Sequence, residues 1–258
     1  MDNKTKKALS ALLAPGHFEY FQFTTSTNDI AHQWIKAGIP HFSLVAADEQ
    51  TKGRGRNQRT WFTPPNTALA FSLILTDHLS KDTSYYTGLG AVAVCRVLEQ
   101  HLQLSPKIKW PNDILLNGKK CSGILVESSW LGSALQAIIL GIGINITPDS
   151  VPPPEQLLFP ATAVESAAGH RTDRFVLLEQ IISGIKSDLL HLSFSQLVSE
   201  WNARLAFKGS LVYLENLAGE SINGTLIGID EQGKLILKRA NGATDHITAN
   251  EIHLRPLA

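Results

Sequence analysis

Residues 107–127 read KIKWPNDILLNGKKCSGILVE, and this stretch sets the architecture that we expect for the whole chain. Its apolar residues fall into short blocks at 107–116 and 122–127, which are typical of β-strands. Asn117-Gly118 lies between the blocks, and this dipeptide favours the tight turn of a β-hairpin. Trp110-Pro111 interrupts the first block, because proline has no backbone N–H to donate to a neighbouring strand. The stretch therefore predicts a hairpin in the middle of the chain.

Strand and helix patterns alternate on both sides of this hairpin. Ser26/Thr27 and Gly38 bracket residues 27–36 as helix caps, so a short helix is expected there. Apolar residues at helical spacing predict three more helices, over 86–104, 175–189 and 197–205. Short β-type runs predict strands, and polar or proline-rich stretches predict loops: strands at 43–47, 69–75 and 135–146, loops at 49–66 and 148–160. This alternation indicates an α/β (α+β) fold.

The pattern changes at Gly209. Short β-type runs follow at 211–214, 221–229, 235–238 and 244–248. Asn-Gly or Gln-Gly pairs stand between or near these runs. Such spacing predicts a small β-barrel. We therefore expect two domains, an α/β domain over residues 1–207 and a β-barrel domain over residues 208–258.

Composition excludes several classes of protein. The 258 residues are 43% hydrophobic, and 23 Lys and Arg balance 23 Asp and Glu, so neither a disordered chain nor a protein that coats nucleic acid is expected. Cys95 and Cys121 are too few for a disulfide scaffold or a zinc site. Residues 1–13 lack the apolar core of a signal peptide, and no apolar run approaches the ~20 residues of a membrane helix. We expect a soluble, cytoplasmic protein.

An arginine-rich loop carries the first chemical signal. Gly53-Arg54-Gly55-Arg56-Asn57-Gln58-Arg59 follows Gln50-Thr51-Lys52. Arginine binds phosphate and carboxylate oxygens through two nitrogens, and glycine lets the backbone approach an anion closely. The run by itself fits a solvated basic turn, a nucleic-acid contact or a pocket for a small anion.

Three further stretches also allow a structural and a functional interpretation. Trp110 fits a buried anchor at the start of a strand, and Asp113 fits either an Asx-turn or a partner for a basic group or metal ion. Lys120 is either a surface lysine or a contact to an anion. Gly141 and Gly143, with one residue between them, leave one face of a strand bare, either for a flat ligand or for a packed helix.

Taken together and in order, these stretches resemble the biotin–protein ligase family. The motifs are Ser26-Thr27-Asn28, Gln50 through Arg56 with Arg59 and Trp61, Lys109-Trp110-Pro111-Asn112-Asp113, Lys120 in Lys-Cys-Ser-Gly-Ile-Leu, and Gly141-Ile-Gly-Ile-Asn145. The C-terminal β-rich region extends the resemblance to nearly the whole chain. It implies a central mixed β-sheet flanked by helices, similar to class II synthetases, with a small C-terminal β-barrel.

The resemblance also implies a two-step reaction that uses biotin, ATP and Mg²⁺. In the first step the biotin carboxylate attacks the α-phosphorus of ATP, which gives biotinyl-5′-AMP and pyrophosphate. In the second step a lysine of a biotin carboxyl-carrier protein, such as that of acetyl-CoA carboxylase, takes the biotinyl group. No metal site built by the protein alone is expected, although Asp113 is a candidate ligand for Mg²⁺ bound with ATP.

Site residues follow from the resemblance position by position. The expected catalytic residues are Lys120, Arg54 and Arg56. The expected biotin contacts are Ser26, Thr27, Asn28, Gln50, Gly53, Arg54, Gly55, Arg56, Lys120, Gly123, Gly141 and Gly143. The expected contacts to ATP or the adenylate are Arg56, Arg59, Trp61, Asp113, Lys120, Asn145 and Arg255. Phe159 is a candidate for stacking on adenine, or else an ordinary core or surface residue.

Some members of the family carry an N-terminal helix-turn-helix domain and repress transcription, whereas only about 20 residues precede the first motif here. We therefore expect a monofunctional ligase that does not bind DNA or membranes and that is a monomer or a homodimer. Two rival interpretations remain open. One is a lipoate–protein ligase or octanoyltransferase, and the other is a nucleic-acid-binding module that uses the arginine loop and the β-barrel.

Overall fold

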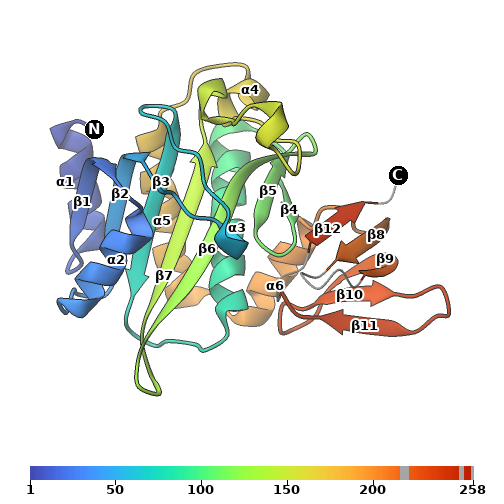
Figure 1. Ribbon diagram of the computed structural model, residues 1–258. Helices are drawn as coiled ribbons and strands as arrows, with labels where there is room; N and C mark the ends of the chain where they lie inside the picture. The colour runs from blue at the N-terminus through green and yellow to red at the C-terminus, as the bar shows by residue number, and fades with distance from the viewer. Residues whose placement is uncertain (216–220, 250–252, 257–258) are drawn as a thin grey trace.

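The computed structural model describes residues 1–215, 221–249 and 253–256, which form two sheets with helices around the larger one (Figure 1). Within this part of the chain the larger sheet has seven strands in the order β1-β2-β3-β7-β6-β5-β4. They are β1 Phe18–Thr24, β2 Ser43–Gln50, β3 Ala68–Leu75, β4 Lys107–Lys109, β5 Asp113–Leu116, β6 Lys119–Leu131 and β7 Ala134–Asn145. Only β1 and β2 pair in parallel, so the sheet is mixed, and the expected α/β fold is confirmed.

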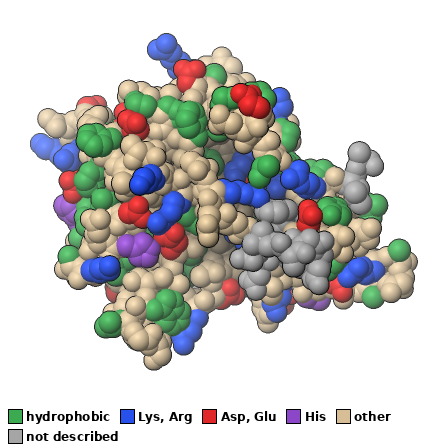
Figure 2. All heavy atoms as spheres, viewed as in Figure 1, with side chains coloured by type: hydrophobic (Ala, Val, Ile, Leu, Met, Phe, Trp, Pro, Cys, Tyr) green, Lys and Arg blue, Asp and Glu red, His purple; other side chains and the backbone are tan. Residues whose placement is uncertain are grey.

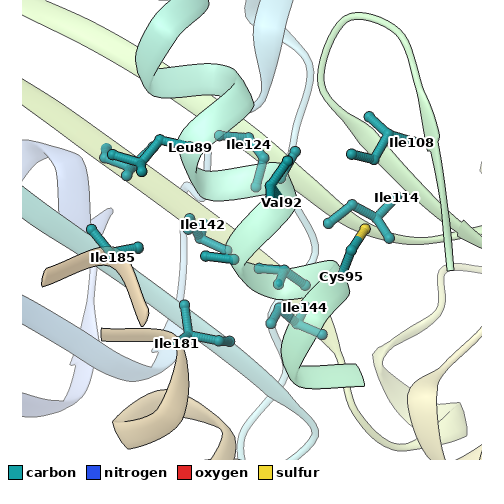
Figure 3. Close-up of a cluster of buried hydrophobic side chains, with 14 of the residues drawn as sticks. Leu89, Val92, Cys95, Ile108, Ile114, Ile124, Ile142, Ile144, Ile181 and Ile185 are labelled. Atoms are coloured by element: carbon teal, nitrogen blue, oxygen red, sulfur yellow. The ribbon is translucent and has the colours of Figure 1, made fainter. Parts of the chain in front are cut away.

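Helices cover both faces of this sheet (Figure 1). Helices α1, α3 and α5 lie on one face and α2 lies on the other. The helices are α1 Asn3–Leu13, α2 Thr27–Lys36, α3 Thr83–Leu102, α4 Val164–Ala168, α5 Arg174–His191 and α6 Phe194–Ala203. Figure 3 shows Val92 and Cys95 of α3 beside Ile142 and Ile144 of the sheet. None of the helices in the described ranges is long and apolar enough to cross a bilayer.

The alternation of side chains along β7 decides which face of the sheet can hold a ligand. Ile138, Leu140, Ile142 and Ile144 point into the core beneath α3 and α5, because successive side chains of a strand face opposite ways. Ala137 and Ile139 point to the α2 side. Gly141 and Gly143 continue this second row, where they leave the sheet without side chains.

The hairpin predicted around Asn117-Gly118 is confirmed. Both residues have positive φ, 50° and 74°, as a type I′ turn requires, and they join β5 to β6. The strand after the turn is longer than expected and ends only at Leu131. Sequence patterns missed α1, β1 and α4, because α1 buries only Leu9 and Leu13 fully and α4 is a single short turn.

The C-terminal strands form a second, antiparallel sheet beside α6 (Figure 1). They are β8 Leu211–Glu215, β9 Ser221–Ile229, β10 Leu235–Lys238, β11 Thr244–Ile247 and β12 His253–Pro256, in the order β11-β10-β9-β8-β12. Among the residues placed here, no pairing joins β11 to β12, so the sheet is open and the expected barrel is not confirmed. Trp110 Nε1 donates to the carbonyl oxygen of Gly233 at 3.0 Å, which connects this sheet to the segment between β4 and β5 of the larger sheet.

Candidate functional site

The first cavity of the site lies on the α2 side of the main sheet, over the two bare glycines of β7. Its volume is about 130 Å³. A Cβ at Gly141 would lie 2.5 Å from Asn28 Oδ1, and a Cβ at Gly143 would lie 2.3 Å from the ring of Trp61. Both glycines are therefore required by close approach, from the start of α2 in one case and from the loop after β2 in the other.

Polar groups at the start of α2 form one end of this cavity. Gln50 Oε1 accepts hydrogen bonds from the backbone N–H of Thr27 at 2.9 Å and from its hydroxyl at 3.2 Å. Ser72 Oγ on β3 lies 2.7 Å from Thr27 Oγ1 and 2.5 Å from Asn28 Oδ1. The network fixes the side chains of three predicted site residues.

Two buried nitrogens in this cavity have no hydrogen-bond partner among the described residues. They are Asn28 Nδ2 and Trp61 Nε1. A buried donor without an acceptor costs about 1–3 kcal/mol. The arrangement therefore suits a small, flat ligand that brings its own oxygen acceptor.

The arginine-rich loop folds over the cavity as an irregular hairpin. The backbone N–H of Gly55 donates to Arg59 O at 2.7 Å, and that of Trp61 donates to Gly53 O at 2.8 Å. Gly53 is buried, and a Cβ there would lie 2.4 Å from the Trp61 carbonyl oxygen. Arg56 donates to Asn112 Oδ1 at 3.3 Å and also to the carbonyl oxygen of Ala249 in the C-terminal region.

A cluster of two lysines and one aspartate forms the other end of the cavity. Lys120 Nζ lies 2.7 Å from Asp113 Oδ1, and Lys109 Nζ lies 3.8 Å from Asp113 Oδ2. Burial raises the pKa of Asp113, but the charges of Lys120 and Lys109 outweigh burial, so its net pKa lies below the usual value. Burial also lowers the pKa of Lys109. The cluster therefore places two lysine ammonium groups in a partly desolvated environment.

A second cavity, of about 550 Å³, meets the first at this cluster. Six residues line both: Arg59, Thr60, Trp61, Lys109, Asp113 and Lys120. Its charged lining residues in the described ranges are four cations, Arg59, Lys109, Lys120 and Arg255, and one carboxylate, Asp113. This excess of positive charge suits a polyphosphate. The two ligands would thus meet beside Lys120.

The donor set does not by itself build a metal centre. No group of three or more His, Cys, Asp or Glu side chains suitable for a metal ion occurs in the described chain. Asp113 is the carboxylate of the second cavity, and both its oxygens face lysines. A divalent cation here would therefore take most of its oxygen ligands from the phosphates of a nucleotide and from water.

The structure brings nearly all of the predicted site residues together. The first cavity is lined by Ser26, Thr27, Asn28, Gln50, Arg54, Gly55, Arg56, Arg59, Trp61, Asp113, Lys120, Gly123, Gly141 and Gly143. The second adds Asn145 and Arg255, whose side chains donate to Thr162 O at 3.2 Å and to Leu158 O at 3.1 Å. Gly53, the first residue of the loop, lines neither cavity.

Sequence reasoning missed three residues of the site. Ser72 stands in an apolar strand, and only its direct contacts to Thr27 and Asn28 connect it to the site. Lys109 and Asn112 belong to the Lys109–Asp113 motif, but the resemblance gives neither of them a role. Phe159 lines the second cavity, where Lys109 Nζ lies 4.7 Å from its ring centroid.

Comparisons with known proteins agree with this geometry. Residues 20–145 match the biotin/lipoate A/B protein ligase family, and residues 214–255 match the biotin protein ligase C-terminal domain. The chain is 33% identical over 234 residues to the bifunctional ligase/repressor BirA of Bacillus subtilis, across 88% of this chain and 70% of that one. It is 32% identical over 228 residues to the biotin–[acetyl-CoA-carboxylase] ligase of Paracoccus denitrificans, across 85% and 93%. The structure of a biotin protein ligase from Aquifex aeolicus in complex with biotin and ATP is similar, with a TM-score of 0.82 at 27% identity, across 93% and 99%.

Proposed function

The chain belongs to the biotin protein ligases of the biotin/lipoate A/B protein ligase family, and from this we propose how its site performs the reaction. The enzyme joins biotin to ATP as biotinyl-5′-AMP with release of pyrophosphate. It then transfers the biotinyl group to a lysine of a biotin carboxyl-carrier protein, and AMP leaves. The observation that supports our assignment of roles is the meeting of two cavities at Lys120, Asp113 and Lys109.

We place biotin in the first cavity. Its ring system lies beside Asn28 and Trp61, the side chains that approach Gly141 and Gly143, and its ureido group meets the unpartnered Asn28 Nδ2 near Thr27 and Gln50. Ser26, Gly55 and Gly123 complete the wall. The carboxylate at the other end of the biotin chain then points to Lys120.

We place the nucleotide in the second cavity, with its phosphates at Arg59, Lys109 and Lys120. Asn145 and Arg255 lie farther along this cavity and are assigned to the nucleoside. The Trp61 ring lines both cavities and separates the two ligands. Mg²⁺ is expected to arrive with the triphosphate, with Asp113 as the nearest carboxylate.

Lys120 and Lys109, where the two cavities meet, reduce the repulsion between the two negatively charged substrates. A carboxylate and a phosphate 4 Å apart repel each other by about 4 kcal/mol at an effective dielectric constant of 20. Lys120 and Lys109 offset this repulsion, and Lys120 also stabilises the charge that develops at phosphorus. Asp113 holds Lys120 in place until the ligands arrive.

We also propose a division into a catalytic domain, residues 1–207, and a C-terminal domain, residues 208–258. Arg56 supports a functional link between them, since it reaches Ala249 from the loop over biotin. We further propose that the enzyme acts as a monomer or homodimer without binding DNA. Lys plus Arg equals Asp plus Glu, so gel retardation of duplex DNA is expected to be negligible.

The decisive experiment is the intact mass of a biotin carboxyl-carrier domain incubated with the protein, biotin, ATP and Mg²⁺. One biotinyl increment is expected, and it should vanish when ATP is omitted. Parallel reactions with lipoate and octanoate test the neighbouring branch of the family. A lipoyl or octanoyl increment in place of the biotinyl one would overturn the assignment.

A further inference from the structure

A charged cluster lies at the edge of the biotin cavity, away from the reacting centre. Arg54 Nη1 is 2.5 Å from Asp29 Oδ1 of α2, and its Nη2 is 3.0 Å from Glu127 Oε2 of β6. His32 Nε2 of α2 lies 3.0 Å from the same Glu127 oxygen. Figure 2 shows acidic, basic and histidine side chains gathered on this face beside α2.

The position of the cluster separates Arg54 from the chemistry. The Lys120 ammonium group reaches along β6 to Gly123, where a Cβ would lie 3.4 Å from Nζ, and Glu127 is four residues farther on, which corresponds to roughly 13 Å along a strand. A guanidinium held at Glu127 is therefore not in contact with anions bound at Lys120. This geometry argues against the direct catalytic role expected for Arg54 and leaves its presence in the loop to be explained.

The cluster joins three elements that surround biotin. Asp29 follows Asn28 at the start of α2, Glu127 lies on β6 beyond Gly123, and Arg54 belongs to the loop that covers the cavity. Each carboxylate takes a different nitrogen of the guanidinium, which is the bridging geometry that arginine provides and lysine does not.

We propose that Asp29 and Glu127 are positioning residues, which hold Arg54 and thereby keep the 53–59 loop closed over bound biotin. This inference rests on the proposed function for its ligand but not for its geometry. Arg54 links the loop to both walls, and His32 lies beside the Glu127 carboxylate. The side chains of the cluster are 25–40% exposed, so these ion pairs stabilise the closed loop only moderately. Neutralising one carboxylate is expected to increase loop opening about 1.5- to 5-fold.

The first test needs no ligand. Arg56 is half-buried in the closed loop, so cleavage by trypsin after Arg56 reports opening of the loop, and mass mapping of the fragments gives the rate at this site. Asp29→Asn and Glu127→Gln should each accelerate this cleavage, and the double variant should accelerate it further. Asp245→Asn is the matched control, since it breaks a similarly exposed pair with Arg239 in the C-terminal sheet. Equal cleavage in the parent, the two single variants and the double variant would overturn the proposal.

The second test measures dissociation of labelled biotin during a chase, without ATP. The same variants should release biotin faster than the parent, with unchanged thermal midpoints. In an Arg54→Ala background the two carboxylate changes should add no further acceleration, because no cation remains to be held. An additive increase in that background would show that Asp29 and Glu127 act independently of Arg54, and the proposal would fail.

The two tests keep this inference separate from the proposed function. A parent protein that binds no biotin contradicts the proposed function, while the trypsin experiment still decides whether the cluster holds the loop. If the parent binds biotin and the variants match it in both assays, the role proposed for Asp29 and Glu127 is wrong and the proposed function stands.

Discussion

Lys120 Nζ lies 2.7 Å from Asp113 Oδ1 at the wall that the two cavities share. The pair is partly buried, and Trp61 covers the ammonium group at 5.5 Å from its ring centroid. A lysine held in this way is already desolvated on one side before an anion arrives. Its interaction with a developing negative charge is therefore stronger than it would be in water.

We expect Lys120→Ala to lower ATP–pyrophosphate exchange about 10²- to 10³-fold, because it removes a charge that stabilises the transition state. Lys119→Ala is the matched control, since Lys119 is the adjacent, exposed lysine of the same strand. The control should exchange at the parental rate, and both variants should keep the parental thermal midpoint. Parental exchange in Lys120→Ala would remove this residue from the chemistry.

At the scale of single residues, motifs located residues in unusual local sequences better than residues in ordinary ones. Lys120 and Arg56 stand in unusual sequences, where basic residues follow glycine, and such runs are visible without a structure. Ser72 could not be found, because a serine inside an apolar strand is common and its two partners are 44 and 45 residues away. Long-range contacts of this kind leave no local pattern.

The helices behind the sheet are joined by an arginine-centred network. Arg96 of α3 donates to Asp188 of α5 at 2.7 Å and through Nε to Glu200 of α6 at 2.8 Å. Arg204, which follows α6, donates to Glu99 of α3 at 2.7 Å. Three helices that carry no site residue are thereby held to one another behind the sheet.

Glu200→Gln should destabilise the fold at neutral pH and much less in acid. The hydrogen bond from Arg96 is the main cause of a lowered pKa for Glu200 in the folded state. The stabilisation is therefore complete above the unfolded pKa of about 4.3 and is lost as the pH falls through the folded value. We expect a loss of about 0.5–1 kcal/mol at pH 7, reduced for partial exposure, and a smaller loss at pH 3.

Urea unfolding of parent and variant at the two pH values provides the measurement. Glu155→Gln, at an exposed position in the proline-rich loop, is the control and should shift neither curve. An equal loss of stability at pH 3 and pH 7 would mean that the carboxylate charge is not responsible.

At the scale of elements, the sequence was informative wherever a turn or a period was strong. The Asn117-Gly118 turn and the long α3 helix emerged from local patterns. Strand β1 was missed, although FEYFQFT is rich in aromatic residues, because it lies at a sheet edge where alternation is weak. The parallel pairing of β1 with β2 depends on the α2 crossover and is a tertiary property.

The C-terminal sheet is attached to α6 by a side-chain amide that bonds the backbone of β9 as a neighbouring strand would. The Asn202 side chain donates to the carbonyl oxygen of Ile229 and accepts from its N–H, both at 2.9 Å. Gly228 next to it must be glycine-sized, since a Cβ would lie 2.8 Å from Asn202 Oδ1. Sequence patterns predicted the β-rich region but not the hydrogen bonds between Asn202 and Ile229.

Asn202→Ala should loosen the C-terminal sheet without unfolding the main domain. Loss of two hydrogen bonds costs about 2 kcal/mol, which corresponds to roughly 30-fold faster amide exchange in β9 and β10. Asn241→Ala, which removes one contact to Ala243 N in an exposed turn, should leave exchange in β9 unchanged. Acceleration that reached α3 equally would indicate global destabilisation instead.

The strand order also has a consequence for biosynthesis. Strand β3 (ALAFSLIL) pairs on one side with β2, but its other partner is β7, so this edge stays open until residue 145 has been made. Translation of the intervening 70 residues, from Leu75 to Asn145, takes about 4–14 s at 5–20 residues per second. During this interval the nascent chain exposes an apolar strand edge that can pair with other chains. Released fragments 1–133 should therefore aggregate more readily than fragments 1–146, and chaperones that cover apolar strands should act on this enzyme before its site exists.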